Sequence, residues 1–169
     1  AVTVIVVPDR SSNEVPLPGA TPPMPSSGLL RRVCEYLDAR RLLTTELFVV
    51  APRYVTLEVR AEVVADDSAD TRRVKEDVEL QLRTYFDPLQ GGDDAAGWPF
   101  GGALRYSKIV QQVFSVAGVD SVPSLVLVVD DIERAPCTDV SLAGIAPNAL
   151  LQLTAYDVSV VTQREVTDA

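Results

Sequence analysis

The sequence YFDPLQGG at residues 85–92, followed by GWPFGG at residues 97–102, separates two amphipathic segments and decides how they meet. It holds the only Trp, two of the four Phe and five of the nine Gly of the 169-residue chain. Pro88 ends the segment before it, because proline cannot continue a helix. Glycine permits backbone angles and close approaches that other residues do not. The stretch therefore predicts a shaped loop that fixes how two helices and a sheet pack together.

Helical periodicity is present on both sides of this loop. Before it, a helix capped by Asp70 or Thr71 has an apolar stripe formed by Val74, Val78, Leu82 and Tyr85. After it, a helix is predicted over about 106–116, with Gly118 at its C-terminal cap. A further helix is predicted to begin after Ser26 or Ser27, with an apolar face of Leu29, Leu30, Val33, Cys34 and Leu37.

Strands are predicted between these helices. Residues 54–65 alternate between apolar and polar side chains, which is typical of a strand with one wet face. Other strands are predicted at residues 1–7, 47–51, 122–129 and 151–161, with a short one near 140–142. The order β-α-β-β-α-α-β-β-β places helices on one side of mainly antiparallel sheets, which makes the chain an α+β protein.

Composition divides the chain into three parts. Residues 1–25 read as a strand followed by a segment with six of the twelve Pro, either a flexible linker or an extended segment that wraps along a neighbouring surface. Residues 26–66 form a first α/β half, and residues 67–169 form a second half that contains the loop at 87–102. Because the chain opens inside a strand-like run and lacks an initial Met, we expect a fragment of a longer protein.

Charge and cysteine content exclude several classes of protein. The net charge is −9, and residues 67–169 carry eight Lys/Arg against sixteen Asp/Glu, which argues against nucleic-acid binding. This acidic half is either a solvated face or one side of a charged interface. No apolar run is long enough to span a membrane. Cys34 lies on an apolar helix face and Cys137 in a loop, so a reducing compartment fits best and the role of Cys137 stays open.

Catalytic chemistry is not visible in the sequence. The absence of His excludes a Ser-His-Asp triad, a Cys-His pair and histidine metal ligands. The paired glycines are not followed by the residues of a phosphate-binding loop. Three pairs of adjacent acids lack calcium-loop spacing and are favoured as solvated turn residues: Asp66-Asp67, Asp93-Asp94 and Asp130-Asp131. We therefore expect no enzyme activity, no metal and no cofactor.

Two clusters have alternative interpretations. Trp98, Pro99 and Phe100 are either an exposed anchor for a partner or a small core tucked beneath the helices, and the buried alternative is favoured because large aromatic residues are mostly buried. Arg40 and Arg41, predicted in the last turn of their helix, either complement its dipole or bind a partner's carboxylate.

A series of motifs resembles the C-terminal portion of baseplate J-like proteins, which are wedge components of contractile phage tails and related injection particles. The resemblance covers about residues 29–130, and in many relatives Gly102 would be Arg. The motifs are VxxYLDxRRLLTT at 33–45, VAPxYxxLxV at 50–59, LxxYFDPLxGG at 82–92, GWPFG at 97–101 and VxGV at 116–119.

This resemblance implies a structural role. Family members pair within a wedge, and wedges join into a six-fold ring around a central hub. The ring rearranges when the particle fires. For this chain it implies contacts with other wedge subunits, with a second copy, and with sheath or hub proteins, after assembly in the bacterial cytoplasm. The candidate contact residues are Asp87, Pro88, Gly91, Gly92, Trp98, Pro99, Phe100 and Gly101 in the loop, with Arg40 and Arg41 as candidate charges.

A binding module is the alternative function. In that interpretation the chain recognises carbohydrate or a cell surface at a tail tip, with the rings of Trp98 and Tyr106 as stacking platforms.

Overall fold

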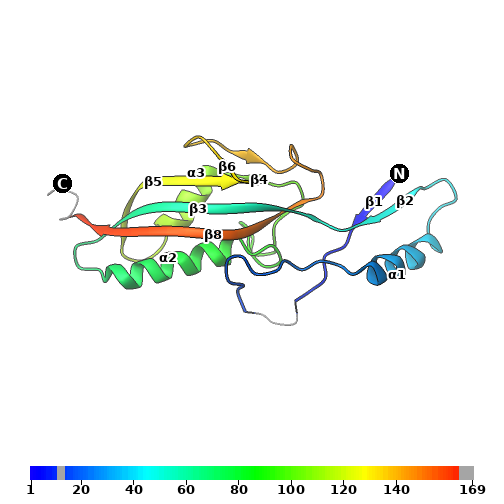
Figure 1. The fold of residues 1–169 in the computed structure, drawn as a ribbon, viewed down its shortest axis with the longest axis horizontal. Coiled ribbons are helices and arrows are strands. Elements are labelled where there is room, and N and C mark those ends of the chain that lie inside the picture. Colours follow the sequence, from blue (N-terminus) through cyan, green and yellow to red (C-terminus); the bar gives the residue numbers. More distant parts are fainter. Residues whose placement is uncertain (11–13, 164–169) are drawn as a thin grey trace.

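The computed structural model describes residues 1–10 and 14–163, so residues 11–13 of the predicted Pro-rich segment and 164–169 of the predicted second half lie outside the described residues. The main body is a four-stranded sheet with the order β6-β5-β3-β8. Helix α2 (Thr71–Tyr85) lies along β8, and α3 (Tyr106–Phe114) packs on β5 (Figure 1). The strands are β3 (Arg53–Ala65), β5 (Val119–Val129), β6 (Ile132–Glu133) and β8 (Ala149–Thr162).

Strand pairing confirms the α+β class. Antiparallel pairing joins β5 to β3 and β6 to β5, and it also joins the short strands β4 (Ala103–Leu104) and β7 (Val140–Ser141). Strand β8 runs parallel to β3, from Arg53 opposite Ala149 to Ala65 opposite Thr162. The sheet thus combines strands from the predicted halves 26–66 and 67–169. The parallel β3–β8 pairing and the short strands β4 and β6 are features that the sequence patterns did not predict.

The core lies between the apolar face of the sheet and the two helices. The apolar residues of β3 are buried as the alternation predicted: Val55, Leu57, Val59, Ala61 and Val63. The predicted stripe of α2 is buried opposite them: Val74, Val78, Leu82 and Tyr85. Ile109 and Val113 of α3 complete this layer. Arg60 and Glu62, two polar positions of this alternation, are exposed.

A bulge in β8 explains why its sequence alternates only in part. Leu57 pairs with Leu153, but the next residue, Glu58, pairs with Ala155. The extra residue is Thr154, whose hydroxyl donates to the Leu57 carbonyl at 3.0 Å. An inserted residue shifts the period-two alternation by one position. Apolar positions in β8 therefore change phase between Leu153 and Val158.

The N-terminal elements form an arm, defined here as residues 1–7 and 26–50, that extends beyond the body (Figure 1). Its strands β1 (Val2–Ile5) and β2 (Leu47–Val50) pair in parallel. Helix α1 (Ser27–Asp38) packs on β2 and is capped by Ser26, whose hydroxyl accepts from the Leu29 amide at 3.2 Å. No residue of the arm is buried. The arm thus has almost no core of its own.

A Pro-rich strap, residues 8–10 and 14–25, connects β1 to α1 and crosses the body on the way. The Gly19 amide donates to the Leu153 carbonyl at 3.2 Å, and the Gln152 side chain donates to the Ala20 carbonyl at 2.9 Å. The Tyr54 hydroxyl donates to the Pro23 carbonyl at 2.9 Å. The strap therefore lies against the open edge of β8 at its bulge. Within the described residues, no helix is both long and apolar enough to cross a membrane.

We expect Leu82→Ala to lower the free energy of unfolding by about 2–5 kcal/mol, because it opens a cavity under α2. Leu82 is fully buried between the helix and the sheet. Urea unfolding followed by circular dichroism measures the change. Leu80→Ala on the same helix is the matched control, since Leu80 is exposed. Equal unfolding midpoints for the two variants would contradict the assigned core face of α2.

Candidate functional site

Asp87 is a buried carboxylate, 2% exposed, at the junction of α2, the loop and the strap. Its Oδ1 accepts from the Leu89 amide at 2.9 Å and from the Gln90 amide at 3.4 Å. Its Oδ2 accepts from Nη2 of Arg10 at 2.5 Å. Local side-chain bonds of this kind favour a turn over a continued helix. Asp87 thus ends α2, shapes the loop and anchors the strap.

The backbone of the loop folds back onto the end of α2. The Gly91 amide donates to the Asp87 carbonyl, and the Gly92 amide donates to the Tyr85 carbonyl, both at 2.8 Å. A Cβ on Gly91 would lie 2.3 Å from the Tyr85 carbonyl oxygen, which no side chain tolerates. Gly97 has a φ of +91°, in the left-handed region that favours glycine. These two glycines are required by the path of the chain.

Trp98 fills the space beneath the loop and is 8% exposed. Its ring stacks on Phe86 with centroids 5.9 Å apart, and Tyr85 meets it edge-on at 5.6 Å. Its indole Nε1 donates to the Tyr85 carbonyl at 2.9 Å. Of the two alternatives for Trp98, the structure therefore shows the buried one: its ring is part of a small aromatic core, and its indole nitrogen has a hydrogen-bond acceptor. Phe100 differs, being 40% exposed beside an exposed Pro99.

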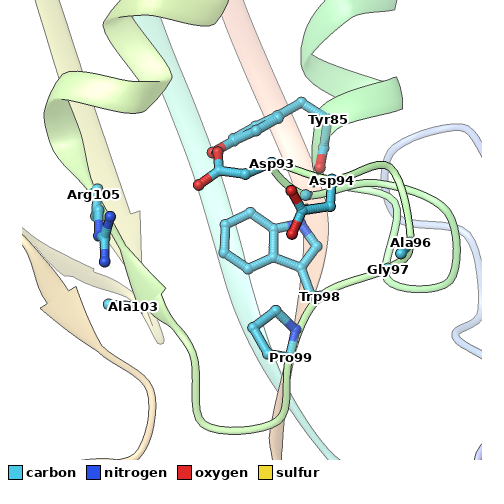
Figure 2. Close-up of a pocket in the computed structure, with 10 residues that line it drawn as sticks. Tyr85, Asp93, Asp94, Ala96, Gly97, Trp98, Pro99, Ala103 and Arg105 are labelled. Carbon is cyan, nitrogen blue, oxygen red and sulfur yellow. Dashed lines mark hydrogen bonds between the residues drawn. The ribbon is translucent and has the colours of Figure 1, made fainter.

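An open cavity of about 450 Å³ lies beside the loop, and Figure 2 shows its walls. The rings of Tyr85 and Trp98 form one side, Asp93 and Asp94 lie on the rim, and Arg105 lies across from them. The Tyr85 hydroxyl donates to Asp93 Oδ1 at 3.0 Å. Burial, and then the Asp93 carboxylate, raise the pKa of Tyr85, so this hydroxyl stays a donor.

This cavity is suited to recognition by charge and shape. Its described lining contains no Ser, Cys or His that would act as a nucleophile or base. Among residues 1–10 and 14–163, no group of three or more Cys, Asp or Glu is gathered to hold a metal. Carboxylates and a guanidinium on opposite sides are groups that pair with charged side chains of another protein.

Arg40 and Arg41, the two arginines predicted as contact charges, lie in the arm, apart from the loop. Helix α1 ends at Asp38, so the prediction that Arg40 and Arg41 occupy its last turn is wrong. Asp38 instead accepts a hydrogen bond from Arg41 Nε, whose guanidinium also donates to the Thr45 carbonyl. Arg40 lies over the Tyr36 ring, 3.8 Å from its centroid. Both arginines therefore have partners within the arm, and their predicted contact with another subunit stays a prediction.

Sequence reasoning missed Arg10 and Arg105. Arg10 pairs with a carboxylate 77 residues away, and no local pattern marks such a pair. Arg105 precedes α3 at a position that reads as an ordinary charged surface residue. Asp93 and Asp94 were interpreted as turn residues, and their place beside the aromatic rings could be found only from the folded loop.

A comparison with solved structures finds a similar fold in a chain of the cryo-EM structure of the anti-feeding prophage (AFP) baseplate, six-fold symmetrised. The TM-score is 0.60 at 21% sequence identity, and the match covers 92% of this chain. The chain spans 29% of the length of that baseplate chain. At this identity the match shows a shared fold. No family model matches the sequence, and no curated protein matches it.

We expect Gly91→Ala to destabilise the protein by more than about 1 kcal/mol, because the new Cβ collides with backbone. The closest atom, the Tyr85 carbonyl oxygen, cannot move without shifting the end of α2. Thermal unfolding measures the effect. Gly28→Ala is the control, since a Cβ there would meet its nearest neighbour at 3.9 Å and alanine favours a helix. Wild-type stability for Gly91→Ala would show that the loop path is misassigned.

We expect Asp87→Ala to cost about 3 kcal/mol or more, because it leaves the Arg10 guanidinium without its carboxylate and two loop amides without their acceptor. Denaturant unfolding gives the value. Asp94→Ala, at an exposed position in the same loop, should change stability by no more than about 0.5 kcal/mol. If both variants lost the same small amount, Asp87 would have no anchoring role.

Proposed function

We propose that this chain is a structural subunit of the baseplate of a contractile, phage-tail-like injection particle, and that it acts through protein–protein contacts. The observation that carries the proposal is the fold shared with a chain of the anti-feeding prophage baseplate over 92% of this chain. The loop motifs supply independent support, because they resemble a baseplate family without reference to any structure.

Within the baseplate we propose a wedge subunit that takes part in assembly and in the rearrangement on contraction. The arm supports this role. It contains no buried residue, yet it exposes large apolar side chains: Val2, Leu42, Leu43 and Phe48. Leu43 is fully exposed. Exposed apolar groups on a segment without a core are typical of surfaces that another protein covers. The proposed partners are other wedge subunits, a second copy of this chain, and sheath or hub proteins.

We propose no catalytic role. The carboxylates and the guanidinium beside the loop are groups that pair with charged side chains of another protein. The sugar-binding alternative has less support, because Trp98 is only 8% exposed and its ring stacks on Phe86. We place assembly in the bacterial cytoplasm, followed by residence in the particle.

The test is a tagged pull-down of the full-length protein from its native producer, with mass spectrometry of the proteins that co-purify. We expect sheath, hub and other wedge proteins. Wild-type protein without the tag is the control for background. Recovery of the bait alone, or of bait with cell-wall sugar, would overturn the baseplate proposal.

A matched pair of variants tests the loop as a contact surface. Phe100→Ala truncates an exposed loop ring, and Phe114→Ala truncates an exposed ring at the end of α3. Both should keep the wild-type melting temperature, because neither ring is in the core. We expect Phe100→Ala to reduce recovery of the co-purifying subunits and Phe114→Ala to leave it unchanged. Equal recovery for both would exclude the loop tip from the contact.

A further inference from the structure

A small cavity of about 50 Å³ lies between the strap and the C-terminal end of α2. The strap contributes Arg10, Leu17 and several prolines to its walls, and the body contributes Arg83, Phe86 and Asp87. A cavity needs about 10–15 Å³ to hold one water, so this cavity has room for a few waters or one small ion. Its walls join two parts of the chain that are distant in sequence.

Two arginines, Arg10 and Arg83, line this cavity. Arg10 pairs with Asp87 through Nη2, but its Nε is buried without an acceptor. The Nε of Arg83 is also buried without an acceptor. Within the described part of the chain, Arg83 has neither a hydrogen bond nor an ion pair of its own. An oxyanion in this cavity would therefore be the first partner of the Arg83 guanidinium, and hydrogen bonds between charged groups are stronger than those between neutral groups.

The charges at the cavity do not balance. Asp87 is its lining carboxylate, and the Asp87 oxygens already accept from Arg10 and from two loop amides. Glu79 lies one turn before Arg83, but it is not part of the lining, and it interacts with Lys75 and with the Tyr156 hydroxyl. Two cations thus face one saturated anion. Apolar wall residues such as Phe86 lower the local dielectric constant, which strengthens the attraction between this excess positive charge and an anion.

We propose that the cavity binds a small oxyanion between Arg83 and Arg10, of the size of inorganic phosphate or a small carboxylate. Guanidinium groups are the residues best matched to these ligands, because their planar donors pair with two oxygens at once. Every residue that lines the site belongs to this one chain, so the purified chain tests the proposal without any particle.

Bound there, the anion would join the strap to the body. Arg10 belongs to the strap and Arg83 to α2, and the strap is one of the two connections that hold the arm. Occupancy would therefore slow the opening of the strap. The Gly19 amide reports this opening, because it donates to the Leu153 carbonyl of β8.

The experiment is isothermal titration of the purified 169-residue chain with sodium phosphate and, separately, sodium acetate, in a buffer free of other oxyanions. Arg83→Met keeps the apolar stem and removes the guanidinium. We expect it to weaken binding about tenfold or more, the value of one to two charged hydrogen bonds. Arg73→Met is the matched control on the same helix, because Arg73 is 81% exposed and lies 3.8 Å from Asp77. It should bind as the wild type does.

Arg83→Lys is a second variant that retains the charge, and it should bind with intermediate affinity. Hydrogen exchange supplies an independent readout: the anion should slow exchange of the Gly19 amide in the wild type and not in Arg83→Met. Binding of phosphate alone or of acetate alone would identify the oxyanion class. The proposal is overturned if the wild type binds neither anion at millimolar concentration, or if Arg83→Met binds either one as tightly as the wild type.

Discussion

The buried Asp87 carboxylate is the constraint on which the rest of the structure depends. A carboxylate removed from water is costly unless donors surround it, and here the donors come from two loop amides and from Arg10 of the strap. Satisfying this one group requires α2 to end at Tyr85, the loop to turn back at Gly91 and the strap to cross the body. The helix end, the aromatic core under the loop and the path of the N-terminal segment are therefore fixed together.

The body and the arm are stabilised in different ways. The body has a continuous core between its sheet and two helices, and Val7 at the end of the arm also packs against it. The arm has a two-stranded parallel sheet and one helix without a buried residue, an arrangement that is marginal when isolated. Its position depends on the strap and on Pro52, which lies just before β3. A rigid body with a dependent arm suits a subunit that works by contact with neighbours.

Much of the fold could be predicted from local patterns. The alternation at Val55–Val63, the stripe from Val74 to Tyr85 and the cap at Ser26 each depend on residues a few positions apart, and all three are confirmed. The candidate loop was found from its glycines and its Trp, and its shape follows from Gly91 and Gly97. The end of α1 was misjudged, because Asp38 and Arg41 form a local pair that competes with another helical turn.

By itself, the sequence determined the helices and the strands other than β4 and β6, the solvent-exposed and buried positions of β3, and the existence of a glycine-rich corner. Only the tertiary structure decided that β8 pairs in parallel with β3, that Arg10 meets Asp87, and that Asp93, Trp98 and Arg105 surround one cavity. The physical reason is the separation along the chain over which each interaction acts. Periodicity, capping and steric limits at glycine act within one or two turns of chain. Strand direction and distant ion pairs depend on the free energy of the whole packed molecule, in which a group 77 residues away counts as much as a neighbour.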